Sequence, residues 1–344
     1  MKKRSPYMAR LVIALAFVVG ASNAARGEEF YKGKMIRFIV GFSAGGGFDT
    51  YTRAIARHIG KHIPGNPSTV VQNMPGAGSL IAANYVYNKA RPDGLTIGTW
   101  VGGLVLQQVM GGKAIKFDAR RFEWVGTLVR ESHACALTKA SGITSLDKWF
   151  AATTPVKIGA TAPGSTTDDI PRMLRAFLNL PIQLIEGYKG TSKIRLAAEG
   201  GEIAGGCWTW SSIKVTWRKA LESGEVRVVL QINPKKHPDL PDVPNAVDYV
   251  KTDEARRLIQ AGIHKQGAIL RVYSLPPGTP KDRVQLVRRA FMDTMTDPEF
   301  LAETKKARLA IDPLPGEAVA KHVSGFFELK PQLVAKLKEI LVPK

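Results

Sequence analysis

The 344-residue chain has the composition of a globular protein, with 44% apolar and 23% charged residues. Its formal net charge is +20, but the basic residues are scattered and form no run of five or more. This scattered distribution is typical of basic residues on solvated surfaces and not of a nucleic-acid-binding surface, so we predict no nucleic-acid partner.

The first residues follow the pattern of a secretory signal peptide. Four basic residues among the first ten precede an apolar run over 11–19 and a small-residue end at 21–24. We predict cleavage after Ala24 and export to the periplasm. No later stretch approaches the roughly 18 to 20 uninterrupted apolar residues that a spanning helix needs. We therefore expect a soluble mature protein.

Removal of the signal peptide leaves enough chain for two domains. The only cysteines are Cys135 and Cys207. In an exported protein they can pair, but two cysteines do not make a disulfide framework. Buried free thiols remain an equal alternative.

The first predicted strand, over 35–40, is followed by the loop Gly41–Asp49 (GFSAGGGFD) and by a helix over 49–63. Such a junction leaves unpaired backbone N–H groups at the positive end of the helix, and glycines let a ligand approach them closely. The sequence therefore predicts an anion-binding loop.

His58 and His62 lie one turn apart in the same helix. Two histidines at this spacing can ligate zinc, but the glutamate of a metalloprotease motif is missing between them. We therefore favour a solvated helix end and predict no metal site.

The next segments repeat the alternation of strand, glycine loop and helix. Strands over 69–72 and 95–100 flank a second glycine junction, Asn73–Ser79, and a helix that extends to about residue 90. Ser79 is placed to cap that helix. Glycine-rich loops after successive strands are typical of a doubly wound α/β sheet, in which ligands bind beyond the carboxyl ends of the strands.

A second α/β unit follows, with small-residue loops after two of its strands, over 161–166 and 187–192. Prolines between 234 and 244 indicate a return crossing between the units. Extended segments are predicted over 123–130, 134–138, 156–160, 183–186, 203–207, 226–232 and 268–274. Helices are predicted over 168–178, 192–199, 253–262, 281–296 and 298–306, with one last amphipathic helix over 316–341.

Seven motifs run in order over nearly the whole predicted mature chain: GFSAGGGFD, QNMPGAGS (Gln72–Ser79), PDG (Pro92–Gly94), APGST (Ala162–Thr166), GYKG (Gly187–Gly190), PDLPDVP (Pro238–Pro244) and LPPGTP (Leu275–Pro280). Their order and spacing resemble the tripartite tricarboxylate transporter receptor family, the TctC or Bug type of periplasmic solute-binding proteins.

The resemblance implies a type II periplasmic-binding-protein-like α/β fold. Two lobes, each a mostly parallel sheet flanked by helices, would be joined by two crossings and close on a small ligand. We predict lobe I over 28–132 and 245–344 and lobe II over 133–244. The implied ligand is a di- or tricarboxylate or an aromatic acid, with no cofactor. The implied protein is a monomer that delivers its ligand to membrane transporter subunits. One alternative stays open: the protein could be a periplasmic sensor that uses the same site for signalling.

The family's ligand loops map onto 42–47, 76–79, 164–166 and the strand end at 207–208. Ser43, Ser165 and Thr166 would donate hydroxyls, and the loop glycines would allow close backbone approach. The predicted ligand-binding residues are Phe42, Ser43, Ala44, Gly46, Gly47, Phe48, Asp49, Gly76, Ala77, Gly78, Ser79, Trp100, Gly164, Ser165, Thr166, Tyr188, Cys207 and Trp208.

The chain departs from the family pattern at Phe48, where a small hydroxyl residue is usual. Phe48, Trp100, Tyr188 and Trp208 can stack on an aromatic ligand, or they can be core residues. For Asp49 we favour a first-turn position on the helix dipole over direct ligand contact, because a carboxylate ligand would be repelled.

Gly41–Gly45 also satisfies the G-x-S-x-G pattern of a nucleophile elbow, which would make the protein a secreted serine hydrolase using Ser43. That fold needs earlier strands to supply the oxyanion-hole loop, and Ser43 follows the first predicted strand. We therefore predict no catalytic residue and no enzyme.

Overall fold

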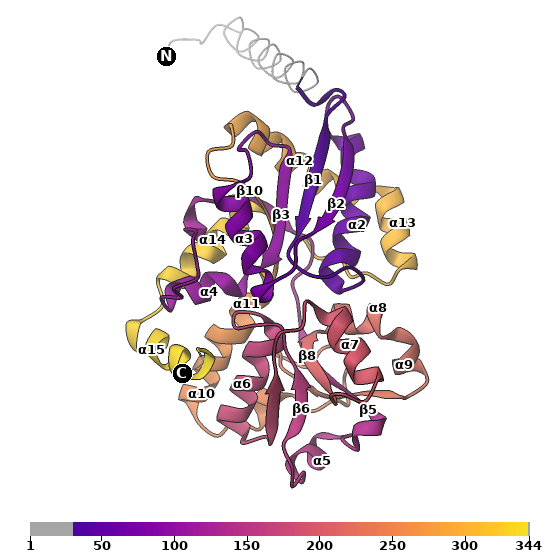
Figure 1. Ribbon diagram of the computed structural model, residues 1–344, viewed down its shortest axis with the longest axis vertical. Helices are drawn as coiled ribbons and strands as arrows, with labels where there is room; N and C mark the ends of the chain where they lie inside the picture. The colour runs from indigo at the N-terminus through magenta and orange to yellow at the C-terminus, as the bar shows by residue number, and fades with distance from the viewer. Residues whose placement is uncertain (1–29, 343–344) are drawn as a thin grey trace, which may run out of the picture.

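The computed structural model describes residues 30–342 as two α/β lobes, each built on its own sheet (Figure 1). The predicted signal peptide lies outside the described residues. The strand order is β11-β4-β10-β3-β1-β2 in the first sheet and β7-β6-β8-β5-β9 in the second. This arrangement confirms the predicted α/β class with two sheets flanked by helices.

Both sheets are mixed, with one inner strand reversed in each. β10 pairs antiparallel with β3 and β4, and β5 pairs antiparallel with β8 and β9. β1 pairs parallel with β2 and β3, and β6 pairs parallel with β7 and β8. The first sheet contains β1 (Met35–Val40), β2 (Ser68–Asn73), β3 (Thr96–Val101), β4 (Glu123–Thr127), β10 (Arg271–Leu275) and β11 (Leu314–Pro315). The second contains β5 (His133–Thr138), β6 (Val156–Gly159), β7 (Ile182–Ile185), β8 (Gly205–Thr209) and β9 (Val226–Gln231).

Helices surround both sheets, and among residues 30–342 none combines the length and apolar character needed to cross a membrane. The α-helices are α2 (Gly47–Ile59), α3 (Leu80–Asn88), α4 (Gly103–Val109), α5 (Leu146–Phe150), α6 (Thr166–Leu178), α7 (Thr191–Glu199), α8 (Trp210–Thr216), α9 (Arg218–Glu222), α10 (Asp253–Ile259), α11 (Lys265–Gly267), α12 (Lys281–Thr296), α13 (Pro298–Lys306), α14 (Gly316–Phe327) and α15 (Pro331–Leu341). Short 3-10 helices are η1 (Gly60–His62), η2 (Ala77–Ser79), η3 (Ala119–Arg121), η4 (Lys139–Ser141) and η5 (Ala246–Asp248), and η6 (Gln260–His264) is a π-helix.

The first strand and helix form where the side-chain pattern predicts them. β1 buries Ile36 and Phe38 completely. In α2, Tyr51, Ile55 and Ile59 recur every fourth residue and are fully buried, because this spacing brings them onto one face of the helix. The apolar face fixes α2 against the sheet, and its N-terminus then projects beyond the end of β1.

Two sequence-based expectations about helix ends are wrong. The last helix is not continuous over 316–341 but breaks into α14 and α15, because Pro331 lacks an N–H and pushes Lys330 into an extended conformation (ψ 135°). Ser79 precedes α3 but does not cap it. Its hydroxyl instead accepts the N–H of Val101 at 3.0 Å, which joins this loop to β3.

The segments that link the lobes lie side by side. Glu131, which follows β4, donates its N–H to the carbonyl of Gly267 at 2.9 Å, and Gly102 donates to the carbonyl of Leu270 at 3.0 Å. The chain thus returns to the first sheet just before β10. These hydrogen bonds hold the two lobes together at the segments that link them.

The proline-rich stretch after β9 folds back onto the second sheet. Gln231 Nε2 donates to the carbonyls of Leu240 and Val243 at 2.8 and 2.9 Å. Further along the chain, α10 and α15 contact each other, and α15 contacts α6 of the second lobe (Figure 1). The lobe boundaries expected from the sequence stay a prediction.

Cys135 and Cys207 form a disulfide between β5 and β8. They are directly opposite in the antiparallel register, and their Cα atoms are 4.0 Å apart. Both are fully buried. Of the two alternatives that the sequence leaves open, the structure contains the disulfide.

We predict that the double variant C135A/C207A is less stable than the wild type by about 2–5 kcal/mol, because the bridge closes a long loop in the unfolded chain. Urea unfolding followed by circular dichroism measures the difference. Wild type unfolded with reductant should approach the variant. Equal midpoints for oxidised wild type and variant would contradict a stabilising bridge.

Candidate functional site

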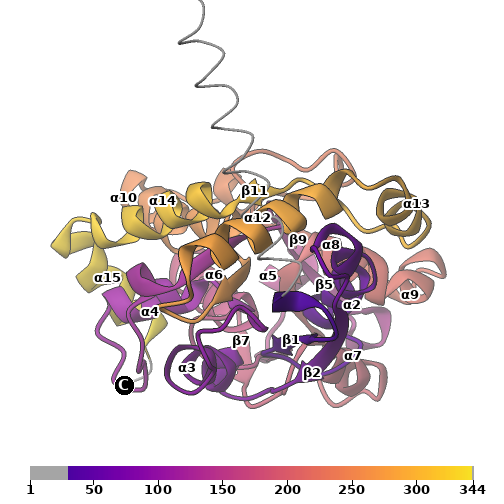
Figure 2. The same ribbon diagram turned by 90° about the horizontal axis from the view of Figure 1, so that it is seen from above.

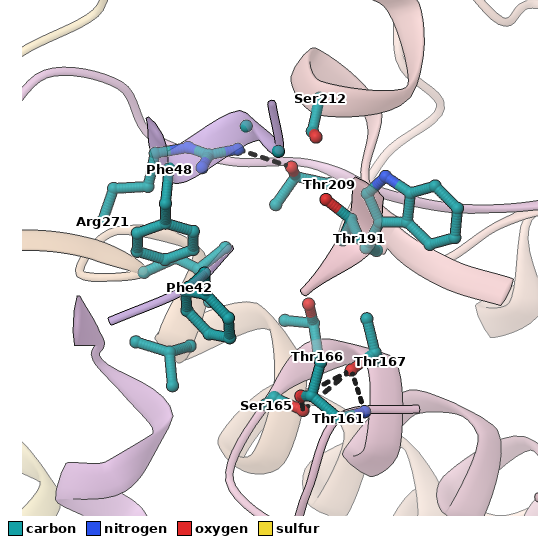
Figure 3. A pocket seen from close by; sticks show the side chains of 15 residues that line it. Phe42, Phe48, Thr161, Ser165, Thr166, Thr167, Thr191, Thr209, Ser212 and Arg271 are labelled. Atoms are coloured by element: carbon teal, nitrogen blue, oxygen red, sulfur yellow. Dashed lines mark hydrogen bonds between the residues drawn. The ribbon is translucent and has the colours of Figure 1, made fainter. Parts of the chain in front are cut away.

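A small cavity of about 30 Å³ lies between the two lobes, where loops from both meet (Figure 3). One water molecule needs about 10–15 Å³ of such space, so the cavity admits only a small group while the lobes touch. Its lining residues are Phe42, Gly46, Gly47, Phe48, Val101, Thr161, Ser165, Thr166, Thr167, Thr191, Trp208, Thr209, Ser212, Leu270 and Arg271.

Helix α2 begins at this cavity without a side-chain cap. Gly46 is the N-cap residue, so the N–H groups of the first turn keep their donor capacity. A Cβ atom at Gly47 would lie 2.5 Å from Ser212 Oγ and 2.8 Å from Arg271 Nη2. Only glycine therefore lets the second lobe and Arg271 approach this helix end so closely.

Asp49 belongs to the same loop but does not line the cavity. Its carboxylate accepts hydrogen bonds from Gly45 N at 2.9 Å, Arg53 Nε at 3.0 Å and Asn73 Nδ2 at 2.9 Å. Burial alone would raise the pKa of Asp49, but the bonds from Arg53, Gly45 and Asn73 outweigh it and hold the pKa below its usual value. The side chain therefore ties the glycine loop to α2 and β2.

Ser43 joins the two lobes directly. Its N–H donates to the carbonyl of Lys189 at 2.9 Å, and its Oγ is 2.9 Å from Ser192 Oγ, which in turn donates to the carbonyl of Ala44 at 3.0 Å. A Cβ atom at Gly190 would lie 2.5 Å from Ser43 Oγ, so glycine is required there. Within residues 30–342, the Ser43 hydroxyl bonds to no histidine, as a nucleophile elbow would require.

The loop before α6 and the first turn of that helix supply most of the hydroxyl groups at the cavity. Thr161 Oγ1 is 2.6 Å from Ser165 Oγ and 3.0 Å from Thr167 Oγ1, and Thr161 N also donates to Thr167 Oγ1. These three hydroxyls are occupied within the loop. The Thr166 hydroxyl points into the cavity and bonds to none of residues 30–342 (Figure 3).

Two buried carboxyl groups lie in the first turn of α6. Burial raises the pKa of Asp168 to about 7, against the opposing effect of Arg172, whose Nε is 2.6 Å away. Burial, aided by the charge of Asp168, also raises the pKa of Asp169 well above its usual value. At neutral pH these acids therefore carry less than their full negative charge, which leaves this helix end receptive to an anion.

Arg271, on β10, is the one charged residue among 30–342 that lines the cavity. Its Nε donates to Glu131 Oε1 at 2.5 Å, and its Nη2 donates to Thr209 Oγ1 at 2.8 Å. Its guanidinium carbon lies 4.7 Å from the centre of the Phe48 ring and 4.9 Å from that of Tyr51. The guanidinium is thus fixed by the linking segment, by the second lobe and by two aromatic faces.

Seven of the eighteen predicted site residues line the cavity, and the other eleven lie elsewhere. Those that line it are Phe42, Gly46, Gly47, Phe48, Ser165, Thr166 and Trp208. Those that do not are Ser43, Ala44, Asp49, Gly76, Ala77, Gly78, Ser79, Trp100, Gly164, Tyr188 and Cys207. Trp100 packs in a core of aromatic rings and donates its indole N–H to Ser274 Oγ. Cys207 is part of the disulfide, and the Tyr188 hydroxyl donates to Glu202.

Several lining residues were not predicted: Val101, Thr161, Thr167, Thr191, Thr209, Ser212, Leu270 and Arg271. Thr161 and Thr191 lie inside the predicted loops over 161–166 and 187–192, and Thr167 directly follows the first loop. Taking each whole loop and its next residue as part of the site would therefore have found all three. For Arg271 the available signal was a lone cation in an otherwise apolar extended segment, because buried strands rarely contain unpaired charges.

The histidine pair faces α13, not solvent as expected. His58 Nε2 is 2.8 Å from Glu303 Oε2, and His62 Nε2 is 2.8 Å from Asp297 Oδ2, where α13 lies beside α2 (Figure 2). His58, Asp297 and Glu299 hold possible ligand atoms within 4.8 Å of one another. The ammonium of Lys61 is already 2.7 Å from Asp297 and 2.6 Å from Glu299, so a cation of the protein already pairs with both carboxylates.

A model of the tripartite tricarboxylate transporter family receptor matches residues 52–318 of the chain. A Cupriavidus necator protein described as the UPF0065 protein in the gbd 5′ region is 25% identical over 305 residues, covering 87% of this chain and 86% of that protein.

Solved structures of periplasmic binding proteins share the fold. The structure of BugD has a TM-score of 0.73 at 20% identity, covering 90% of this chain and 98% of that one. MatC from Rhodopseudomonas palustris, solved with malate, has a TM-score of 0.69 at 19% identity, covering 88% and 99%. An R. palustris protein solved with adipate has a TM-score of 0.70 at 20% identity, covering 90% and 98%.

We predict that D49N lowers the free energy of unfolding by about 1–3 kcal/mol at pH 7, since it removes a charge-assisted bond to Arg53 and weakens the bond to Gly45. Because the folded pKa of Asp49 is depressed, its contribution is complete above the unfolded pKa near 4 and is lost as pH falls through the folded value. The stability difference between variant and wild type should therefore shrink below about pH 4.

Thermal unfolding at pH 7, 5 and 3 measures this difference. D312N is the matched control, because Asp312 pairs with Arg130 on the exposed surface, where an ion pair contributes little. A D49N deficit that is the same at all three pH values would contradict the role given to the Asp49 charge.

Proposed function

The chain belongs to the family of tripartite tricarboxylate transporter receptors, and from this premise we propose that it captures a small carboxylate between its lobes and delivers it to a membrane transporter. One observation carries the proposal. The N-termini of α2, α6 and α7 meet at a single cavity that is also lined by hydroxyl groups and a guanidinium.

Helix N-termini attract anions because their first N–H groups lack acceptors within the helix and the helix dipole is positive there. Gly46 and Gly47 lie at the start of α2 and line the cavity. Ser165 and Thr166 line it at the start of α6, and Thr191 lines it at the start of α7. Donors without acceptors dominate this arrangement, which suits a ligand that only accepts hydrogen bonds. A carboxylate is such a ligand.

The aromatic residues favour an aliphatic carboxylate over an aromatic one. The Phe48 ring lies 4.6 Å from the Phe42 ring, centre to centre, and its face is also turned to the guanidinium of Arg271. Trp208 stacks on Trp217, with ring centres 5.5 Å apart. Because these faces are already occupied, little aromatic surface remains for stacking on a flat ligand.

Ligand capture would require the lobes to separate and close again. The hydrogen bonds of Ser43 to Lys189 and Ser192 bridge the lobes beside the cavity, so they must break before a ligand enters. A ligand that touches both lobes then stabilises the closed form. The transporter would recognise this closed form, and the family membership supports that final step.

We predict that the protein without its signal peptide binds aliphatic carboxylates such as malate or adipate. Bound ligand should raise the melting temperature, because it binds the native state alone. Thermal-shift screening followed by calorimetry measures this, with the corresponding amides as matched uncharged controls. Stabilisation by sugars or by the amides, with none by any carboxylate, would contradict the proposal.

We predict that T166V weakens carboxylate binding about tenfold or more, because a hydrogen bond to a charged group contributes about 1.5–3 kcal/mol. Its unfolding midpoint without ligand should stay near that of the wild type, since the Thr166 hydroxyl bonds to none of residues 30–342. T167V is the matched control: it should lower stability, because Thr167 Oγ1 accepts the N–H of Thr161. Unchanged affinity in T166V would place the ligand elsewhere.

A further inference from the structure

Arg271 and Glu131 form a buried ion pair at the edge of the cavity. Their side chains are 2% and 1% exposed, and Arg271 Nε is 2.5 Å from Glu131 Oε1. Ser211 Oγ lies 2.8 and 2.7 Å from the two Glu131 oxygens. Glu131 is therefore satisfied by one cation and one hydroxyl, and it holds the Nε edge of the guanidinium in place.

The Nη1 end of the Arg271 guanidinium has N–H donors that the described residues leave without acceptors. Arg271 Nη1 is buried and has no hydrogen-bond partner among the described residues, and the same holds for Ser212 Oγ. Buried polar groups in native proteins are nearly always paired, and an unpaired group on a charged side chain is especially costly. Two such groups beside one cavity indicate that a further acceptor belongs there.

Both unpaired groups belong to side chains that converge on the start of α2. A Cβ atom at Gly47 would meet Ser212 Oγ at 2.5 Å and the guanidinium of Arg271 at 2.8 Å. Figure 3 shows the guanidinium beside Phe48, with its hydrogen bond to Thr209, and Ser212 on the same side of the cavity. Arg271 comes from the first lobe and Ser212 from the second, so an acceptor between them would contact both.

Resting on the proposed function, we propose that Arg271 and Ser212 together bind one carboxylate group of the ligand, and that Glu131 is the positioning residue for Arg271. The ligand oxygen approaches Nη1 end-on, because Glu131 and Thr209 already occupy Nε and Nη2. Glu131 also neutralises the guanidinium while the site lacks ligand, which avoids an isolated buried charge.

This assignment makes Arg271 a determinant of charge specificity. The uncapped helix ends and the threonine hydroxyls donate to any acceptor, including an amide oxygen, whereas a guanidinium distinguishes a carboxylate from its amide by charge. Loss of Arg271 should therefore reduce the preference for acid over amide, and not only the affinity.

The test uses the double variant R271M/E131Q, which removes both charges and so avoids a buried unpaired carboxylate. Calorimetry with malate and adipate, and with their amides, gives the dissociation constants. We expect wild type to prefer acid, and we expect the folded double variant to bind the acids about 100-fold more weakly and with a smaller preference for acid over amide, because only the helix dipoles still favour an anion. R130M/D312N, which removes an exposed pair beside Glu131, should bind like wild type.

A second variant covers the case in which the double variant does not fold. S212A removes a buried hydroxyl that has no partner, so it should fold normally and bind the acids about tenfold more weakly. Wild-type affinity in S212A, or a folded double variant whose preference for acid over amide equals that of the wild type, would overturn the assignment. Failure of wild type to bind any carboxylate would instead overturn the proposed function.

Discussion

The hydrogen bonds between the glycine loop after β1 and the loop before α7 are the contacts on which the geometry of the cavity depends. Ser43 and Ala44 bond to Lys189 and Ser192 across the lobes. The glycines at 47 and 190 make this approach possible, because any side chain there would collide with the opposite lobe. The absence of side chains at these two glycines thus lets the N-termini of α2, α6 and α7 meet at one cavity.

Electrostatics at this space come mainly from backbone dipoles. Asp49 is paired with Arg53, Asp168 with Arg172 and Glu131 with Arg271, so the side-chain charges near the cavity largely cancel. What remains is the positive end of each helix and the free donors of Arg271 and Ser212. In the proposed function, such a site would attract an anion without the large desolvation cost of an isolated buried cation.

The paired linking segments place these groups at the junction of the lobes. Glu131 bonds through its backbone to Gly267, and through its side chain to Arg271 and Ser211. One residue therefore contacts the return segment, the first sheet and the second lobe. A change in the angle between the lobes would therefore alter the position of the guanidinium, and a ligand bound there, as we propose, would contact the same three elements.

The sequence by itself determined the α/β class, the first strand and helix, the glycine loops at the strand ends and the family resemblance, because side-chain periodicity and glycine position are local properties. It also identified Phe42, Gly46, Gly47, Ser165 and Thr166 near the cavity. Only the tertiary structure decided that Cys135 pairs with Cys207, that Trp100 belongs to the core, and that Arg271 reaches the cavity. Each of these depends on which distant strands become neighbours, and no local pattern encodes that pairing.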